Sequence, residues 1–545
     1  MSRLLVYLTL CFVSLPAFAA VPAIPFTVTM SEAVNVTGSP RIVLDVDGNT
    51  RYAVYAAGTG TASLTFTYTA TSGDVDLNGV GIASTSVDLN GGTVTDLNGN
   101  PLANLTFTAP ANMASVNVNY PSLAMDFTND ADGRYSVSGT VYNDLTSFLS
   151  AMGGSFTRAS TATYFDSTGT LQTAAINTPR FDYDPVTHVA KGILIEESRT
   201  NSITNSTMAG SVLGILGSGG VFPTGWNKWN YAGISHTVTG LGTILGMSYI
   251  DIRVSGTNSS GSAAYPDIIV QSNVPASTGQ SWTTSAYVQL IAGDWTGVPW
   301  GPNLSIIERD SGGTSVGGGG TSVRTASWTR TNYTRILASA SVAKIEILFD
   351  FPVSAGASVD FTFRVAVPQL EQGAFSTSFI PTAGSTGTRA ADILTIPTTS
   401  WYGSTDHTLA AQFSIPYLGG TNYPGGIAID NGTNADAVML LVSDAGGDQK
   451  VAEIWSGGIQ DFYNVGAAYS AGTSAKYGVY YATNMARASI DGVLGALDNS
   501  VNIPSVTTLR IGRGRGGNYP LNGNVQKVRY YPLRVSNTQL QLLTQ

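Results

Sequence analysis

The feature that most constrains the fold is the repeated pairing of short alternating runs with tight-turn dipeptides. Residues 63–68 read Ser-Leu-Thr-Phe-Thr-Tyr and alternate with a period of two, which predicts a strand with one buried face. Turn dipeptides recur at Asp47-Gly48, Asn78-Gly79, Asn90-Gly91 and Asn98-Gly99. Strands spaced about ten residues apart predict an all-β sandwich over residues 21–122.

Composition extends this prediction to the whole chain. The 545 residues include 62 glycines and 10% aromatic residues, with 26 basic against 35 acidic side chains. This length is enough for three or four domains with their own cores. Sparse, acidic charge does not favour nucleic acid, whose recognition needs basic patches, so we expect no nucleic-acid partner.

The first twenty residues have the pattern of a secretory signal peptide. Arg3 precedes an apolar run over residues 4–15, and a small-residue cleavage pattern ends at Ala19. We therefore expect a secreted or cell-surface chain after removal of residues 1–20 near Ala19. Cys11 is the only cysteine, so the mature chain has none. No later apolar run reaches the ~18 residues of a spanning helix, so no membrane span is expected.

Residues 154–201 carry the most specific resemblance. The opening at 156–160 (Phe-Thr-Arg-Ala-Ser), the turn at 179–182 (Pro-Arg-Phe-Asp) and the ending at 194–197 (Leu-Ile-Glu-Glu) resemble a segment of phage and prophage tail-fibre or spike proteins and related bacterial surface proteins. The resemblance implies a binding protein rather than an enzyme. We place this segment in a mostly irregular connector, residues 123–205.

One short helix is expected inside the connector, and glycines mark its end. Residues 141–152 place apolar side chains at helical spacing, and Gly153-Gly154 supplies a C-terminal stop. Further along, the run Gly317 to Gly320 predicts a flexible loop. A closing helix near the C-terminus is expected with Ser536 as its N-cap.

Three β-sandwich modules complete the predicted architecture. Residues 21–122, through the runs 28–34 and 92–100, resemble the Ig-like repeats of bacterial adhesins. Residues 206–395, which end in Pro-Gln-Leu-Glu at 368–371, resemble jelly-roll carbohydrate-binding modules. Residues 396–545 resemble a concanavalin A-like, laminin-G-type module through 488–492, 509–512 and 521–531. The predicted fold class is therefore all-β and multidomain.

Catalytic patterns are weak. The three histidines, His188, His236 and His407, fall in different predicted modules, which argues against a metal cluster or a catalytic triad. Glycoside hydrolysis needs two carboxyl groups, and after residue 395 the chain has a single glutamate. Glu196 and Glu197, as strand neighbours, point to opposite faces, and one of them is expected to pair with Arg199 or Arg180.

Aromatic residues in turn-rich segments of the third module are the candidate sugar platform. Exposed rings bind the C–H faces of sugars, and a nearby carboxylate fixes orientation. The alternative is that these rings cap the ends of the sandwich. The candidates are Trp226, Trp229, Asp294, Trp295 and Trp300.

Two further sites follow from charge. Seven basic residues lie between 487 and 534 against two acidic ones, and Arg513 and Arg515 sit in a glycine-flanked loop suited to acidic polysaccharide. The alternative is solvated surface charge. Clustered aspartates in the first module could hold Ca²⁺, although hairpin turns favour the same residues. These aspartates are Asp45, Asp47, Asp74 and Asp76.

Together these patterns favour a secreted, non-catalytic protein that binds polysaccharide or a cell-surface glycan for adhesion. One alternative is a structural subunit of an extracellular fibre or phage-tail-like assembly. The other is a polysaccharide-degrading enzyme with an unrecognised acid pair. No cofactor other than Ca²⁺ is indicated, and homo-oligomerisation stays open.

Overall fold

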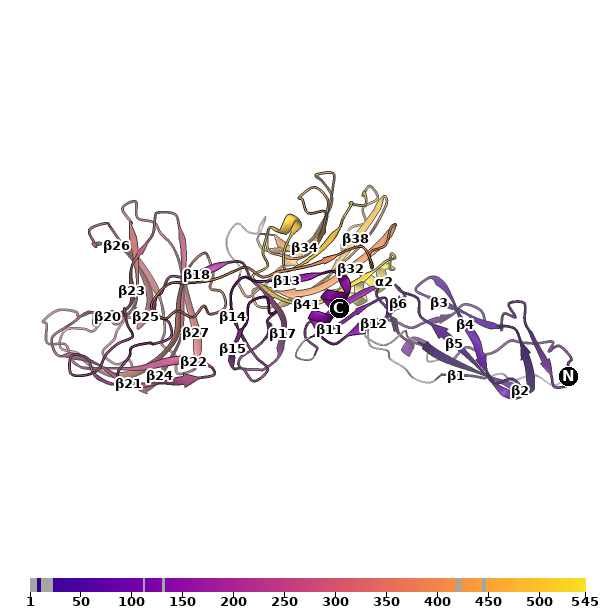
Figure 1. Cartoon of the computed structure of the whole chain (residues 1–545), viewed down its shortest axis with the longest axis horizontal. Coiled ribbons are helices and arrows are strands. Elements are labelled where there is room, and N and C mark those ends of the chain that lie inside the picture. The colour runs from indigo at the N-terminus through magenta and orange to yellow at the C-terminus, as the bar shows by residue number, and fades with distance from the viewer. Residues whose placement is uncertain (1–6, 11–22, 111–112, 130–132, 418–422, 444–446) are drawn as a thin grey trace. The chain divides into compact units, whose positions relative to one another are not determined.

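The computed structural model of the 545-residue chain describes residues 7–10, 23–110, 113–129, 133–417, 423–443 and 447–545. Strands account for about 53% of the chain and helices for about 4%, which confirms the all-β, multidomain class. The chain divides into two compact units, whose elements are labelled in Figure 1. The terminal unit comprises Met1–Ser155, Leu394–Ile415 and Tyr423–Gln545, and the inserted unit comprises Phe156–Ile393 and Pro416–Asn422.

The N-terminal part of the terminal unit is a sheet with the order β1-β2-β5-β4-β3-β7, in which β8 also pairs with β2. Its strands are β1 (Tyr7–Leu10), β2 (Ala23–Thr37), β3 (Arg41–Val46), β4 (Asn49–Ala57), β5 (Thr61–Thr69), β7 (Gly81–Ile82) and β8 (Thr93–Asp96). A short pair joins β6 (Val75–Asp76) to β9 (Val118–Asn119). Leu64, Phe66 and Tyr68 are at most 1% exposed, which confirms the predicted half-buried strand.

The predicted signal peptide falls only partly within the described residues. Tyr7–Leu10 form β1, antiparallel to β2, with Tyr7 opposite Thr29. The expected cleavage position near Ala19 lies outside the described residues. Secretion therefore stays a prediction. None of the helices in the described part of the chain is long and apolar enough to span a bilayer.

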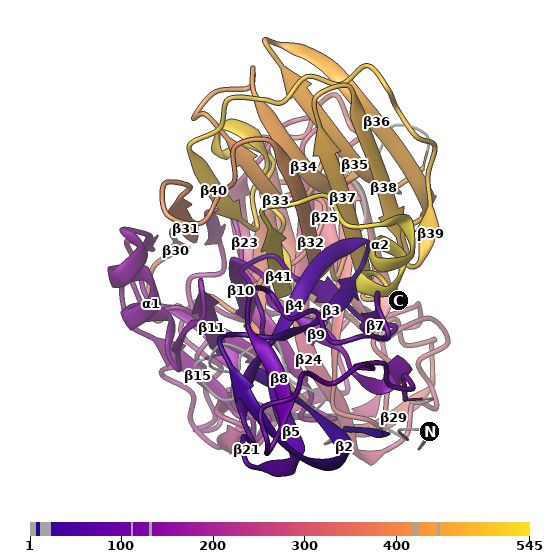
Figure 2. The same cartoon turned by 90° about the vertical axis from the view of Figure 1, so that its right-hand side faces the viewer.

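Two further sheets complete the terminal unit, with the orders β12-β11-β10-β41-β32-β37-β38-β39 and β31-β40-β33-β34-β35-β36. The first contains β10 (Leu123–Asp126), β11 (Arg134–Val137), β12 (Thr140–Tyr142), β32 (Asp406–Ser414), β37 (Ser474–Ala482), β38 (Met485–Ile490), β39 (Val493–Leu494) and β41 (Gly523–Tyr531). The second contains β31 (Ile393–Pro397), β33 (Gly425–Asp430), β34 (Ala437–Ser443), β35 (Gln449–Ser456), β36 (Ile459–Ala468) and β40 (Thr508–Ile511). Figure 2 shows β34, β35 and β36 as neighbours.

The start of the predicted connector belongs to this C-terminal sandwich. Strand β10 pairs antiparallel with β41, with Leu123 opposite Tyr530. All four β10 residues are buried. The sequence predicts a mostly irregular linker here, and the structure differs because the partner strand lies near the other end of the chain. Four residues show too little periodicity to reveal such a pairing.

Each helix has one terminus at its predicted signal: α1 ends before Gly153, and α2 begins after Ser536. Helix α1 (Leu145–Met152) is shorter than the predicted 141–152, because Asp144 is its N-cap and accepts a hydrogen bond from the backbone N–H of Ser147. Gly153 closes it in the left-handed conformation, with φ of 66°. Helix α2 (Asn537–Leu543) begins after Ser536, whose side chain accepts from the backbone N–H of Gln539, as predicted.

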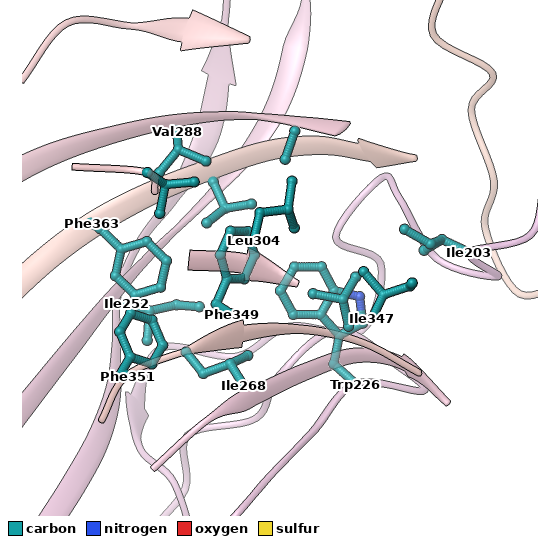
Figure 3. Close-up of a cluster of buried hydrophobic side chains, with 14 of the residues drawn as sticks. Ile203, Trp226, Ile252, Ile268, Val288, Leu304, Ile347, Phe349, Phe351 and Phe363 are labelled. Atoms are coloured by element: carbon teal, nitrogen blue, oxygen red, sulfur yellow. The ribbon is translucent and has the colours of Figure 1, made fainter. Parts of the chain in front are cut away.

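The inserted unit is built around a two-sheet sandwich with the orders β19-β21-β22-β29-β24-β27 and β20-β23-β28-β25-β26. The first sheet contains β19 (Gly214–Ile215), β21 (Ile234–Ile244), β22 (Met247–Thr257), β24 (Ser281–Gly293), β27 (Thr329–Ile336) and β29 (Ser358–Gln372). The second contains β20 (Asn227–Lys228), β23 (Ile268–Pro275), β25 (Asn303–Arg309), β26 (Ser315–Ser322) and β28 (Lys344–Asp350). Apolar side chains from both sheets meet in one core, which Figure 3 shows in part.

The glycine run predicted as a flexible loop is a strand. Residues 317–320 lie in β26 and pair in register with β25, Gly317 opposite Glu308 and Gly320 opposite Ser305. A Cβ on Gly319 would lie 2.3 Å from the Tyr333 hydroxyl, and one on Gly320 would lie 2.1 Å from the Ser305 hydroxyl. The glycines therefore allow neighbouring side chains to pack closely against the strand, and they do not make the segment a flexible loop.

Residues 156–201 contribute charged side chains to a buried ion network in the inserted unit. Asp392 accepts from Arg158 Nη1 at 3.0 Å and from Arg180 Nη2 at 2.5 Å. Glu196 pairs with Arg180 at 2.8 Å and with Arg389 at 3.1 Å. The Arg158, Arg180 and Asp392 side chains are 0% exposed. Arg158, Arg180 and Glu196 thus have a structural role inside the inserted unit.

The interpretation of the two adjacent glutamates is confirmed. Glu196 pairs with Arg180, and Glu197 pairs with Arg199 at 2.6 Å. The two carboxylates pair with different arginines, although both residues follow the end of the strand β17 (Ala190–Ile195) rather than lying within it.

Candidate functional site

The predicted aromatic platform of the inserted unit is only partly exposed. Trp226 is 8% exposed, and its Nε1 donates to the Asn205 carbonyl at 3.0 Å. Figure 3 shows its ring among core side chains that include Ile347. The prediction of an accessible Trp226 is therefore wrong. Its turn-rich neighbourhood suggested exposure, but the ring turns inward and fills the end of the core.

The remaining platform residues differ in exposure. Trp295 packs against Phe361 with ring centroids 4.7 Å apart and joins the edge of the core. Asp294 accepts a hydrogen bond from the backbone N–H of Thr296 at 2.7 Å, which makes it a turn residue. Trp229 and Trp300 are 46% and 74% exposed. These two rings remain available to a ligand.

The two arginines of the basic loop in the C-terminal sandwich make different contacts. Arg513 Nη1 donates to the Gly517 carbonyl at 2.9 Å, within its own loop. Arg515 reaches over the second sheet, where its guanidinium carbon lies 3.5 Å from the Trp455 ring centroid. Arg515 lines a cavity.

This cavity, the Trp455 pocket, lies on one face of β34, β35 and β36 and has a volume of about 380 Å³. Four aromatic side chains, two apolar ones and four polar ones line it. The aromatic residues are Tyr423, Trp455, Tyr463 and Tyr519. The apolar and polar residues are Met439, Leu441, Ser443, Glu453, Gln460 and Arg515.

Cross-strand register places the lining residues of the three strands on one face. Met439 of β34 lies opposite Glu453 of β35, which lies opposite Tyr463 of β36. In the neighbouring row, Trp455 lies opposite Gln460. Directly opposed residues share a face, so these side chains converge although the chain separates them by two turns. Met439 and Leu441 also belong to a small apolar cluster, against which Tyr519 packs.

The loop after β40 forms the upper wall of the pocket, and Asp430 holds it in place. Asp430, at the end of β33, is fully buried and accepts from Arg510 Nε at 2.6 Å. The same carboxylate oxygen accepts from the Gly516 backbone N–H at 2.9 Å. Tyr519 closes this side by packing edge-on against Tyr423, with centroids 6.0 Å apart. Asp430 is therefore a positioning residue for the loop.

Among the described residues, Arg515 Nε is a buried donor of the pocket without an acceptor. The Trp455 indole interacts with the Glu453 carboxylate. Glu453 is 8% exposed and accepts from Gln460 Nε2 at 2.7 Å. Burial raises the pKa of Glu453, and the hydrogen bond from Trp455 and the charge of Arg515 oppose that rise. The pocket thus combines aromatic faces with donors that a polar ligand could satisfy.

Sequence reasoning identified Arg515 and missed the rest of this pocket. Trp455, Glu453 and Tyr463 are far from Arg515 in sequence and carry no motif. Only strand pairing and the loop anchored by Asp430 bring them together. Glu453 and Trp455, two residues apart in β35, share a face of the sheet, and this spacing is a signal that could have indicated a functional face.

The candidate calcium ligands are engaged in local structure. Asp74 accepts from Arg51 Nη2 and from the Tyr68 hydroxyl, both at 2.6 Å. Asp45 accepts from the Gly48 backbone N–H at 2.7 Å, which supports the hairpin-turn alternative. Within the described ranges, no three His, Cys, Asp or Glu side chains form a group that could hold a metal ion.

Asp47 and Asp76 instead meet the C-terminal helix. Asp47 Oδ2 accepts from the Ser536 backbone N–H at 2.8 Å, at the start of α2. Asp76 Oδ1 accepts from the Gly79 backbone N–H at 2.9 Å and from Gln539 Nε2 at 3.3 Å. These two aspartates therefore link the N-terminal part of the terminal unit to the end of the chain.

A pair of carboxyl groups in the inserted unit bears on the enzymatic alternative. Asp267 precedes β23 and Asp350 ends the adjacent β28. Asp267 is 7% exposed, and burial followed by the charge of Asp350 raises its pKa to about 8. The two carboxyls are hydrogen-bonded to each other. Glycosidases hold their carboxyls about 5–9 Å apart, with the sugar bond between them, so this pair is too close for that role.

Comparison with known proteins adds only weak structural similarities. No family model and no curated protein matches the chain. Domain 4 of the extracellular GH43 arabinanase AbnA from Geobacillus stearothermophilus, in complex with arabinotriose, aligns at 12% identity and TM-score 0.23 over 28% of this chain and 73% of that one. The CBM40 of the Ruminococcus gnavus IT-sialidase, bound to α2,3-sialyllactose, aligns at 15% identity and TM-score 0.23 over 26% and 84%.

A third similar structure is the CBM22-1–CBM22-2 tandem of Paenibacillus barcinonensis Xyn10C, at 10% identity and TM-score 0.18 over 59% of this chain and 98% of that one. All three are parts of carbohydrate-active proteins. TM-scores this low carry no functional argument for this chain.

Proposed function

We propose that the protein binds glycans through the Trp455 pocket of its C-terminal sandwich. The observation that carries the proposal is the combination of four aromatic side chains with Glu453, Gln460 and Arg515 around one cavity of about 380 Å³. Aromatic faces pack against sugar C–H surfaces, and a few polar groups fix the orientation of the hydroxyls. A cavity of this size suits one or two sugar rings.

We propose further that binding proceeds without catalysis, on a secreted or cell-surface chain that uses it for adhesion. Among the residues that line the pocket, Glu453 carries the single carboxyl group, whereas glycoside hydrolysis uses two. The exposed Trp229 and Trp300 of the inserted unit offer a second, weaker contact. Two weak contacts on one chain add avidity when both can engage.

The test is a glycan array and polysaccharide pulldown with the full chain, comparing wild type with Trp455→Ala and Trp300→Ala. We expect specific retention that is lost in Trp455→Ala and largely kept in Trp300→Ala, with no release of reducing sugar. Thermal unfolding of each variant checks that the fold persists. Retention that survives Trp455→Ala would contradict the pocket assignment, and an empty array would contradict glycan binding.

A further inference from the structure

The guanidinium of Arg515 is held by the pocket but is only partly used. Its carbon lies 3.5 Å from the Trp455 ring centroid, in cation–π contact. Its Nη1 donates to the Asn434 carbonyl at 3.2 Å, which fixes the plane of the group. Its Nε is buried without an acceptor among the described residues. Within the part of the chain that the structure describes, no acceptor is therefore matched to the Nε/Nη2 edge of this cavity-lining side chain.

Other arginines in this chain show what that edge normally holds. Arg364 binds Asp251 through Nε at 2.8 Å and Nη2 at 2.9 Å. Arg253 binds Asp360 in the same way, with both distances 2.7 Å. In each case two parallel N–H groups meet one carboxylate, the geometry that makes arginine selective for planar oxyanions.

The carboxylate that lines the pocket does not fill this role. Glu453 accepts from Gln460 and interacts with the Trp455 indole, and among the described residues it forms no salt bridge with Arg515. A ligand that matches the Arg515 edge must be rich in acceptors, which a carboxylate is and a hydroxyl, itself a donor, is less so.

We propose that the saccharide bound in the Trp455 pocket carries a carboxylate, as uronic and sialic acids do, and that the Nε/Nη2 edge of Arg515 binds it. This inference rests on the glycan-binding function proposed above. The net charge of the chain is −9, so non-specific attraction of a polyanion is disfavoured. Selectivity for an acidic sugar then has to come from a local, oriented group such as Arg515.

The experiment compares acidic polysaccharides with their carboxyl-reduced forms, which keep the backbone and lose the charge. The probes are polygalacturonate, alginate, hyaluronan and polysialic acid, each with its reduced counterpart, titrated calorimetrically against the full chain. We expect at least one acidic polymer to bind about tenfold or more tightly than its reduced form. The arms distinguish uronate from sialate as the source of the carboxylate.

Two substitutions separate the oriented contact from simple charge. Arg515→Lys keeps the positive charge and loses the two-pronged edge, so we expect the preference for the acidic form to fall about tenfold. The matched control is Arg253→Gln, which removes a 46% exposed arginine of the inserted unit and should leave binding unchanged. Unfolding curves confirm that both variants are folded.

Each outcome decides between the two proposals. Equal binding of acidic and reduced polymers, abolished by Trp455→Ala, would overturn the carboxylate inference and leave glycan binding intact. An acidic preference that persists in Arg515→Lys would also overturn it. Failure of the wild type to bind any polymer here or any glycan on the array would overturn both.

Discussion

Removing the Asp392 carboxylate should strongly destabilise the inserted unit. Asp392 is fully buried and accepts hydrogen bonds from Arg158, Arg180 and the Glu196 backbone N–H, at 2.5–3.0 Å. Asp392→Ala leaves two buried guanidinium groups without their common counter-charge. Breaking a buried ion pair by removing one partner costs about 3–5 kcal/mol, because the remaining charge is neither solvated nor paired.

An exposed pair in the same unit provides the control. Arg253 and Asp360 form an equally short contact, but their side chains are 46% and 61% exposed. Surface pairs contribute about 0–1 kcal/mol, since water and salt screen them. Asp360→Ala should therefore change the free energy of unfolding by less than about 1 kcal/mol. Comparing Asp392→Ala with Asp360→Ala isolates the effect of burial on the free energy of unfolding, because both substitutions remove an aspartate that is bound to arginine.

The measurement is thermal and urea unfolding of the full chain, with hydrogen exchange assigning the affected unit. A loss of about 3–5 kcal/mol in a unit of this size corresponds to a lower melting temperature by on the order of 10 °C. Exchange protection should fall in the strands that carry the network. If Asp392→Ala costs no more than Asp360→Ala, the reasoning from burial is refuted.

Two further predictions concern pH and the pocket loop. The pKa of Asp267 is raised to about 8 in the folded state, above its ordinary value of about 3.9. Folding therefore favours the protonated carboxyl group. The stability that this group contributes is complete below about pH 4 and is lost as the pH rises toward 8. The side chain introduced by Asp267→Asn stays neutral. Between pH 5 and 8, the free energy of unfolding from urea titrations should therefore change less with pH in the variant than in the wild type, by up to about 1.4 kcal/mol per pH unit. Parallel pH profiles of the two proteins would contradict the raised pKa of Asp267. Asp430→Ala removes the acceptor of Arg510 Nε and of the Gly516 N–H. Calorimetric titration should then show that glycan binding is weakened several-fold. Unchanged affinity in the folded variant would show that the loop after β40 does not position Arg515.

The sequence by itself determined the local features. Period-two alternation placed β5 with its buried face, and Gly153 and Ser536 marked the ends of the two helices. The pairing of one of Glu196 and Glu197 with Arg199 or Arg180 was also expected from residue type. These features depend on interactions between residues close in the chain, such as caps and turns, which a sequence displays directly.

Only the tertiary structure decided which distant segments meet. It paired β10 with β41, turned Gly317–Gly320 into a strand and buried Trp226 in the core. It also assembled the Trp455 pocket, because the register of β34, β35 and β36 determines which side chains share a face. A shift of one residue would have turned Trp455 to the opposite face. Long-range register depends on the packing of whole sheets, and no local pattern encodes it.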